Sequence, residues 1–510
     1  MQPYHGFHLF FGDIHSHCGI SYGHGPLADA LANAREQLDF CSVTGHAHWP
    51  DMPASTPRAQ HIIDFHEEGF ARLKRTWPQA LDTLRRQSRE GELVLFPGFE
   101  VHFSRGGDRT IVYRDIDGDL LYPASLDELH RTLRSLRDHG VGVLSFPHHT
   151  AYPKGSRGTD WDAFDPDLEP FVEIVSMHGC SEADEGPRPY LHAMGPADVE
   201  STVRFGLAAG HRFGFVGSTD HHSAHPGSYG HGAMGVWAEA LTRDALWDAF
   251  LSRRTYALTG DRIALQASVN DAPMGAHLPL TDRRDVSVRV EGGGAIDYVD
   301  VIKNNRLLCR FSEDVVFGQR TAGESRDIIH TKVFLELGWG EARELTAWDV
   351  ELSIADGEIR GVEPRFRGRE AVSPEDQPAG GESRFHTSHW ERLGERTVGF
   401  KTASARNPNT RTPATQGMCL DVRMPLSAGV SAVINGRTVE LPLMRLMAGA
   451  SAGFTEGMDS PAWRFHRAPR EHELSWEVGL EDRDPEPAFY YVRVRQKNDQ
   501  WAWSSPIYVM

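Results

Sequence analysis

The feature that most constrains the fold is a series of apolar, strand-like runs that each end in residues able to bind a metal ion. The first run, residues 10–14, leads directly to His15 and His17. Residues i and i+2 of a strand project to the same face, so these two imidazoles can reach one ion. Later runs end at His46, Glu100, His148, His178 and the pair Asp220 and His222.

Segments of helical period separate these runs between about residues 9 and 260. Strands separated by helices predict parallel pairing with the helices outside, and barrels of this kind keep their active sites at the carboxyl ends of the strands. Six strand ends with ligand-type residues favour such a barrel over an open, doubly wound sheet.

The second half of the chain has a different texture. From residue 261 onward, short alternating strands are separated by turns rich in Gly, Pro and Asn, which predicts a sandwich-like β domain. A chain of 510 residues also exceeds what one core usually supports. We therefore predict two domains, 1–260 and 261–510, and leave open whether the second contributes a loop to the substrate pocket or a dimer contact.

Composition excludes some classes of function. A net charge of −18 argues against nucleic acid as a partner. The first twelve residues lack the features of a signal peptide and no run is long enough to cross a bilayer, so we expect a cytoplasmic protein without a membrane partner. Of the 27 histidines, 21 lie between His5 and His231, which predicts that the chemistry belongs to the first half.

The ordered set of ligand-type residues resembles the metal-binding motifs of the PHP superfamily, named for polymerase and histidinol phosphatase domains. The set is His15, His17, His24, His46, Glu100, His148, His178, Asp220 and His222. Residues 255–262 and 503–507 look more like a PHP-like family of unknown function, family 3604, which also has a β-rich tail. The resemblance implies an α/β fold, a distorted (βα)7 PHP-like barrel with a C-terminal β-sandwich-like domain.

The resemblance also implies two or three divalent metal ions, Zn, Mn or Fe. One ion would be held by His15, His17, Glu100 and Asp220, a second by Glu100, His148 and His178, and a third by His24, His46 and His222. Two of these assignments are uncertain by one residue: the ligand is either His148 or His149 at one position, and either His221 or His222 at another. Gly45 stands where the family has the Asp of a Thr-Asp-His motif, which weakens the third position.

Imidazoles and carboxylates suit such ions, and a water between two ions loses a proton near neutral pH to become the nucleophile. Asp220, His222 or His149 could shuttle the proton. Four arginines in loops that follow strands could clamp a phosphate: Arg105, Arg109, Arg114 and Arg157.

These features predict a metal-dependent hydrolase that uses a metal-bridging hydroxide on a small-molecule substrate, a phosphomonoester or phosphodiester. One alternative is a metal-dependent amide, carbamate, ester or lactone hydrolase, which apolar pocket walls without a basic clamp would favour. A second is a metal-stabilised binding module for carbohydrate or protein, which full ligation of every ion would favour. A homo-oligomer also stays open.

Overall fold

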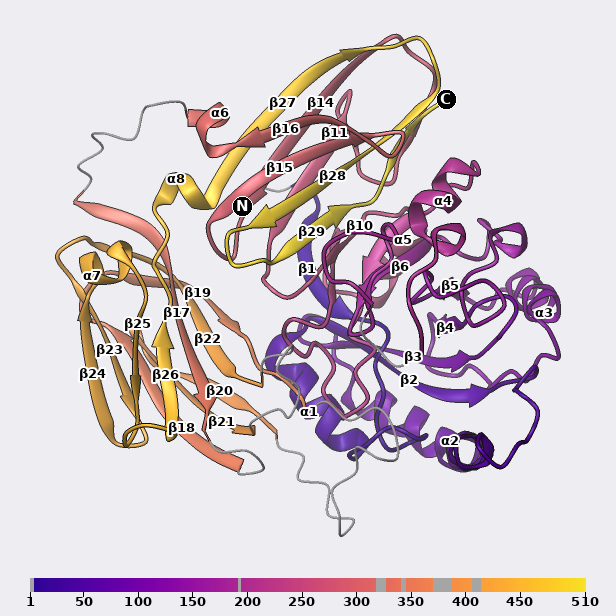
Figure 1. Cartoon of the computed structure of the whole chain (residues 1–510), viewed down its shortest axis with the longest axis horizontal. Helices are drawn as coiled ribbons and strands as arrows, with labels where there is room; N and C mark the ends of the chain where they lie inside the picture. Colours follow the sequence, from indigo (N-terminus) through magenta and orange to yellow (C-terminus); the bar gives the residue numbers. More distant parts are fainter. Residues whose placement is uncertain (1–3, 191–193, 318–326, 341–344, 370–386, 406–413) are drawn as a thin grey trace.

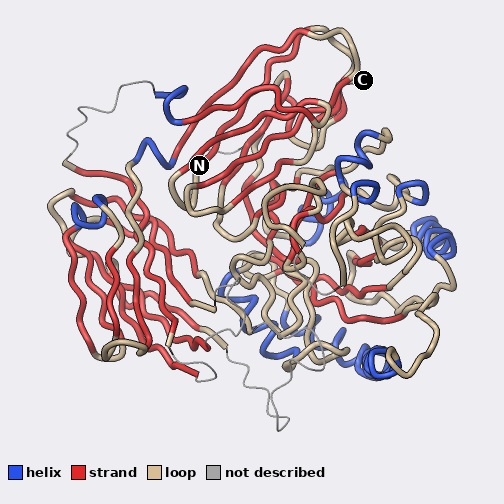
Figure 2. Tube along the Cα trace, viewed as in Figure 1, coloured by secondary structure: helices blue, strands red, loops and turns tan. Residues whose placement is uncertain are grey.

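In a computed structural model, the chain forms an α/β unit followed by two β-rich units (Figure 1). The structure describes residues 4–190, 194–317, 327–340, 345–369, 387–405 and 414–510. Helices gather around the α/β unit, whereas strands dominate the other two units (Figure 2). The predicted combination of a mixed α/β first half and a strand-rich second half is observed. Within the described ranges, no helix has both the length and the apolar character needed to cross a membrane.

The α/β unit contains the strands whose ends carry the predicted ligands. Its strands are β1 (His8–Asp13), β2 (Phe40–His48), β3 (Val94–Val101), β4 (Arg109–Tyr113), β5 (Val143–Pro147), β6 (Phe171–Ser176), β7 (Gly179–Cys180), β8 (Gly214–Gly217), β9 (Ala233–Ala238) and β10 (Thr255–Leu258). Its helices are α1 (Leu27–Gln37), α2 (Gln60–Gln87), α3 (Leu126–Asp138), α4 (Val203–Ala208) and α5 (Arg243–Leu251).

Local sequence explains where these elements begin and end. The Ser125 side chain accepts a hydrogen bond from the Glu128 amide at the start of α3, and the Glu128 carboxylate accepts one from the Ala124 amide. Such reciprocal bonds satisfy amide groups that the first helical turn leaves unpaired. Gly140 follows the helix with a φ of 83°, the left-handed conformation that glycine adopts most easily.

The predicted closed barrel of parallel strands is wrong in its pairing. Seven strands follow the order β10-β9-β1-β2-β3-β4-β5, while β7, β6 and β8 form a separate sheet. The two sheets pack together, with β6 beside β5 and β8 beside β10, but no ladder closes them in the part of the chain that the structure describes. Within the described part of the α/β unit, only β1–β2, β2–β3 and β6–β8 pair in parallel. The connection between β3 and β4 is too short for a helical crossover, so β4 turns back antiparallel.

The β-rich units consist of hairpins and meanders. One unit pairs two five-stranded sheets around a shared core: β17 (Ile328–Trp339), β18 (Leu345–Ile354), β19 (Glu358–Pro364), β20 (His389–Gly394), β21 (Thr397–Ala405), β22 (Gln416–Pro425), β23 (Gly429–Ile434), β24 (Arg437–Pro442), β25 (Ser451–Phe454) and β26 (Pro461–Phe465), with α7 (Leu443–Ala448). We call this unit the sandwich.

The other β-rich unit combines the middle and the end of the chain. It contains β11 (Ala264–Val269), β12 (Ala272–Pro273), β13 (His277–Leu278), β14 (Arg283–Glu291), β15 (Ile296–Lys303), β16 (Arg306–Ser312), α6 (Glu313–Phe317), α8 (Glu471–Leu474), β27 (Ser475–Arg483), β28 (Ala488–Gln496), β29 (Trp501–Ser504) and β30 (Ile507–Val509). Its strand β29 pairs with β10, so one sheet continues from the α/β unit into this unit.

Candidate metal centre

The carboxyl ends of six strands bring most of the predicted ligands to one buried place. His15 and His17 follow β1, His148 follows β5, His178 follows β6, Asp220 and His222 follow β8, and His46 and Glu100 lie near the ends of β2 and β3. Backbone hydrogen bonds join the first and last of these segments, from the Asp220 amide to the His15 carbonyl and from the His17 amide to the His221 carbonyl, each 2.8 Å. The main chain therefore fixes the spacing of the side chains.

Four side chains enclose one point. The Nε2 atoms of His15 and His17 lie 3.2 Å apart, and each lies within 3.4 Å of an oxygen of Glu100 and of Asp220. The sixth distance, between the Glu100 and Asp220 oxygens, is within 4.8 Å. A tetrahedron with edges of about 3.3 Å has its centre about 2.0 Å from every corner, the usual distance from zinc to nitrogen or oxygen ligands. The donor atoms thus have the spacing that one divalent ion requires.

Glu100 and Asp220 each face two groups of imidazoles. Glu100 Oε2 points toward His15 and His17, whereas its Oε1 lies 3.2 Å from His148 Nε2. Asp220 Oδ1 faces His17, and its Oδ2 lies 2.8 Å from His178 Nε2. A carboxylate whose two oxygens face different groups of imidazoles has the geometry of a ligand that bridges two ions.

A third group of ligand atoms adjoins the first. His17, His46 and His222 each offer a ring nitrogen within 4.8 Å of the others. His24, which the resemblance places here, belongs to no such group among the described residues, although its amide donates to the His222 carbonyl. This third group contains no carboxylate of its own.

Among the described residues His17 Nδ1 has no hydrogen-bond partner, but five other imidazoles of the centre are held from behind at Nδ1. Their partners lie at 2.7–3.2 Å and are Glu173 for His15, Ser21 for His46, Thr110 for His148, Tyr152 for His178 and the Asp220 carbonyl for His222. Holding Nδ1 orients the ring and leaves Nε2 available as a ligand.

Several residues of the centre were not predicted. His102 Nδ1 lies 2.9 Å from Glu100 Oε1. His102 follows Glu100 at the same i, i+2 spacing as His15 and His17, one residue beyond the end of β3. Asp108 contacts His102, and Glu173 contacts His15. A carboxylate inside the apolar run 171–175 was a signal for Glu173, because a buried charge needs a partner.

The four predicted substrate-binding arginines lie in different surroundings. The Arg157 guanidinium contacts Asp108, lies 3.7 Å from Glu100 and donates to His102. Arg109 is buried on the opposite face of β4 from Thr110 and pairs with Glu169, because alternate residues of a strand point to opposite faces. Arg105 is exposed, and Arg114 pairs with its neighbour Asp115. Only Arg157 adjoins the predicted ligands within the described residues.

Electrostatics keep two carboxylates and three imidazoles of the centre in forms that bind cations. Burial opposes ionisation of Glu100 and Asp220, yet the surrounding imidazoles outweigh burial and lower the pKa of both carboxyls. Burial lowers the pKa of His46, His148 and His222, and neighbouring imidazoles lower it further, so these rings are neutral. Burial also lowers the pKa of a further imidazole, His15, but the charges of Asp220 and Glu173 outweigh burial and raise it. Ionised carboxylates and neutral imidazoles are the forms that bind metals.

The charge of the centre also fits divalent cations. Four buried carboxylates, Glu100, Asp108, Glu173 and Asp220, contact only one Arg or Lys, Arg157, in the described part of the chain. An uncompensated buried charge costs several kcal/mol. Divalent cations would remove this excess of negative charge, so the residues fit the ions that the resemblance implies.

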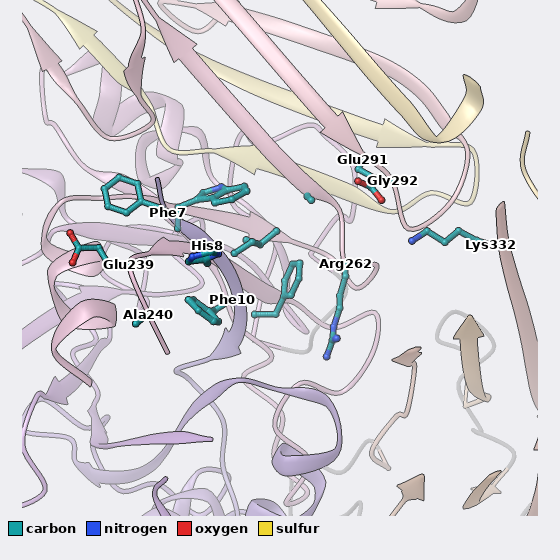
Figure 3. A pocket seen from close by; sticks show the side chains of 13 residues that line it. Phe7, His8, Phe10, Glu239, Ala240, Arg262, Glu291, Gly292 and Lys332 are labelled. Carbon is teal, nitrogen blue, oxygen red and sulfur yellow. The ribbon is translucent and has the colours of Figure 1, made fainter. Parts of the chain in front are cut away.

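A separate pocket lies elsewhere. It has a volume of about 730 Å³ and lies between β1, β9 and the β-rich units, where Phe7, Phe10, Trp237, Arg262, Glu291 and Lys332 line it (Figure 3). None of the predicted metal ligands lines this pocket. The candidate chemistry therefore belongs to the buried centre.

Comparison with known proteins gives short or distant matches. Three uncharacterized proteins, from Chlamydia trachomatis, Chlamydia muridarum and Chlamydia pneumoniae, are 32%, 31% and 31% identical over 189 residues. The aligned part is 34% of this chain and 30% of each relative, so the chain spans less than a third of their length.

A crystal structure of a two-domain protein containing a predicted PHP-like metal-dependent phosphoesterase, from Bacteroides vulgatus, superposes with a TM-score of 0.32 and 14% identity, over 59% of this chain and 80% of that one. The family model described as protein of unknown function (DUF3604) matches residues 225–270. That match contains residues 255–262, so it supports the predicted resemblance to family 3604 over this part of the chain.

Proposed function

We propose that the chain is a metal-dependent hydrolase of the PHP type that cleaves a small phosphomonoester or phosphodiester. The observation that carries the proposal is the pair of carboxylates, Glu100 and Asp220, that each face two groups of imidazoles beside one guanidinium. His15, His17, Glu100 and Asp220 would hold one ion, and Glu100, His148 and His178 a second. His46 and His222, with His24 as the further predicted ligand, would hold a third.

Bound divalent ions would acidify a water and polarise the substrate oxygen that gains negative charge. The chain's own residues supply orientation and charge. Arg157 is anchored to Asp108 through Nε and Nη2, and its Nη1 contacts the Met194 sulfur, a weak acceptor that leaves this nitrogen able to bind an anionic oxygen.

His149 is the strongest candidate to move a proton. Its Nε2 lies 3.4 Å from Asp108, and its Nδ1 has no hydrogen-bond partner among the described residues. The other two predicted proton carriers are more constrained, because both oxygens of Asp220 contact imidazoles and His222 Nδ1 donates to the Asp220 carbonyl. Asp220 and His222 therefore suit ligand roles.

Arg157 favours phosphoester over acyl hydrolysis, because a cation beside the ligands complements a phosphate and contributes little to a neutral amide or ester. The test uses protein loaded with Mn²⁺ or Zn²⁺ and chelator-treated protein, with p-nitrophenyl phosphate, bis(p-nitrophenyl) phosphate and p-nitrophenyl acetate as substrates. We expect metal-dependent turnover of a phosphate.

The matched variant is Glu100→Gln, which keeps the shape of the side chain and removes its charge. It should lose about 1,000-fold in kcat, or roughly 4 kcal/mol of barrier reduction. Loaded protein that cleaves the acetate but neither phosphate would contradict the phosphoesterase proposal and favour the acyl hydrolase.

A further inference from the structure

The groups that hold the metal-facing imidazoles from behind differ in charge. Hydroxyl groups hold His46, His148 and His178, and a backbone carbonyl holds His222. Glu173 alone among these partners is a carboxylate. The ring that it holds, His15, belongs to the group of four donors around Glu100 and Asp220.

The contact between Glu173 and His15 is short and buried. Glu173 Oε2 lies 2.7 Å from His15 Nδ1, and the two side chains are 1% and 0% exposed. Glu173 comes from β6, and 158 residues separate it from His15 in the chain. Its other oxygen, Oε1, has no hydrogen-bond partner within the described residues. The carboxylate is therefore committed to this one ring.

This contact selects one form of the imidazole. An ionised carboxylate can only accept hydrogen bonds, so His15 Nδ1 must carry the proton and donate it. A neutral ring protonated at Nδ1 has its lone pair at Nε2. That atom lies 3.3 Å from Glu100 Oε2 and 3.4 Å from Asp220 Oδ1, at the point that the four donors enclose.

We propose that Glu173 is a positioning residue of the metal centre: it fixes His15 in the tautomer that binds through Nε2, and its charge strengthens binding at the position shared by His15, His17, Glu100 and Asp220. The inference rests on the metal centre of the proposed function but not on its substrate. Outer carboxylates of this kind make a ligating imidazole more basic, and their loss typically costs about 10–100-fold in metal affinity.

The test compares three variants of the full chain with the wild type. Glu173→Gln keeps an acceptor oxygen at nearly the same place but removes the charge. Thr110→Val removes the neutral partner of His148. Glu169→Gln removes a buried carboxylate that pairs with Arg109, on the other side of β4 from the centre. For each protein we measure Co²⁺ and Zn²⁺ dissociation constants by chelator competition, the visible spectrum of bound Co²⁺, and thermal unfolding of the metal-free form.

We expect Glu173→Gln to raise the lowest dissociation constant about 10–100-fold and to alter the Co²⁺ spectrum. Thr110→Val should raise the dissociation constant of a more weakly bound ion and leave the lowest dissociation constant unchanged. Glu169→Gln should lower the unfolding temperature without changing the lowest dissociation constant. A dissociation constant for Glu173→Gln within twofold of wild type overturns the inference, as does an equal loss in Glu169→Gln or a wild type that binds no ion. If affinity falls as expected but no phosphoester is cleaved, the proposed function fails and this inference stands.

Discussion

Three side chains of the candidate metal centre sit on backbone in the left-handed region. His149, Arg157 and Asp220 have φ values of 32°, 72° and 51°. None is glycine, so each conformation costs about 1–3 kcal/mol and persists because surrounding contacts impose it. The Asp220 amide, for example, donates to the His15 carbonyl. Strain of this kind clusters at functional sites, which agrees with the roles proposed for these three residues.

Replacing Arg157 with lysine tests its role as an anion-binding group. Lysine keeps the positive charge beside Asp108 but cannot reproduce the forked contact that a guanidinium makes with a phosphate. We expect Arg157→Lys to raise KM for an aryl phosphate about 10-fold, the loss of one charge-assisted hydrogen bond, with a smaller effect on kcat. Steady-state kinetics measure both constants. Arg105→Lys, at an exposed position, is the control, and equal effects of the two substitutions would contradict a role for Arg157.

At the scale of elements, a strand end of the sandwich supports the loop that follows β8. The segment after β19 crosses to this loop, where the Phe366 carbonyl accepts from the Tyr229 amide at 2.8 Å and the Gly368 amide donates to Ser228 at 2.9 Å. The same loop contains Asp220, a proposed ligand. The sandwich therefore contacts the loop that carries this proposed ligand.

Gly368→Ala tests this support. A Cβ at residue 368 would lie 2.4 Å from His221 Cε1 and 2.5 Å from His225 Cβ, so either the loop or the sandwich segment must move. Overpacking of this kind costs about 1–3 kcal/mol, and we expect metal affinity to fall about 10-fold. Chelator competition measures the change. Gly394→Ala, where no atom lies within 4 Å of the added Cβ, should leave affinity unchanged, and an unchanged affinity in Gly368→Ala would show that the loop does not depend on this contact.

The strand ends and the candidate ligands that follow them were predictable because the signal is local. A run of apolar residues that stops at a histidine can be seen without knowing its neighbours, and the i, i+2 spacing of His15 and His17 fixes a shared face. Pairing direction and buried partners were not predictable, because they depend on distant segments. Glu173 contacts His15, which lies 158 positions away in the sequence. Strand β9 pairs antiparallel with β1, although the two strands lie near opposite ends of the sequence of the α/β unit.

Exposed strands were also missed. Residues 365–413 are rich in charge, Gly and Pro, which predicts long surface loops. Part of this range lies outside the described residues, but β20 and β21 fall within it. In β20, five of the six residues are exposed, so the strand has no buried face to give a period-2 apolar signal. Its pairing with β21 provides the order that its own sequence does not indicate.

At the scale of the whole molecule, a buried ion cluster connects the α/β unit with the end of the chain. Glu182 accepts hydrogen bonds from Tyr491 and Trp503 and pairs with Arg493 and Arg204. Strand β10 also pairs with β29. The division at residue 260 stays a prediction, and these contacts indicate that the segments on its two sides stabilise each other.

The cluster predicts acid sensitivity. Burial opposes ionisation of Glu182, but Arg493 and Arg204 outweigh burial and lower its pKa below the ordinary value. The ionised form therefore stabilises the fold at neutral pH, and this contribution is lost as the pH falls below about 4.3, the value in an unfolded chain. Glu182→Gln should lower the free energy of unfolding by about 2 kcal/mol at pH 7, because it removes the charge that Arg493 and Arg204 share, although Arg493 keeps its pair with Asp300.

Urea unfolding midpoints of wild type and Glu182→Gln, measured between pH 7 and pH 3.5, check this prediction. The difference between the two proteins should be largest at pH 7 and shrink in acid. Asp162→Asn, whose side chain is 92% exposed, is the control and should have little effect. A difference that does not change with pH would mean that the charge of Glu182 is not what stabilises the contact.

The most direct test of the metal centre is the number of ions that the protein binds. Equilibrium dialysis against Zn²⁺, followed by elemental analysis, should give at least two ions per chain for the wild type. Glu100→Gln should retain fewer, because the carboxylate that faces both groups of imidazoles has lost its charge. A wild type without bound ions, or a Glu100→Gln variant that binds as many ions with the same affinity, would contradict the proposed centre.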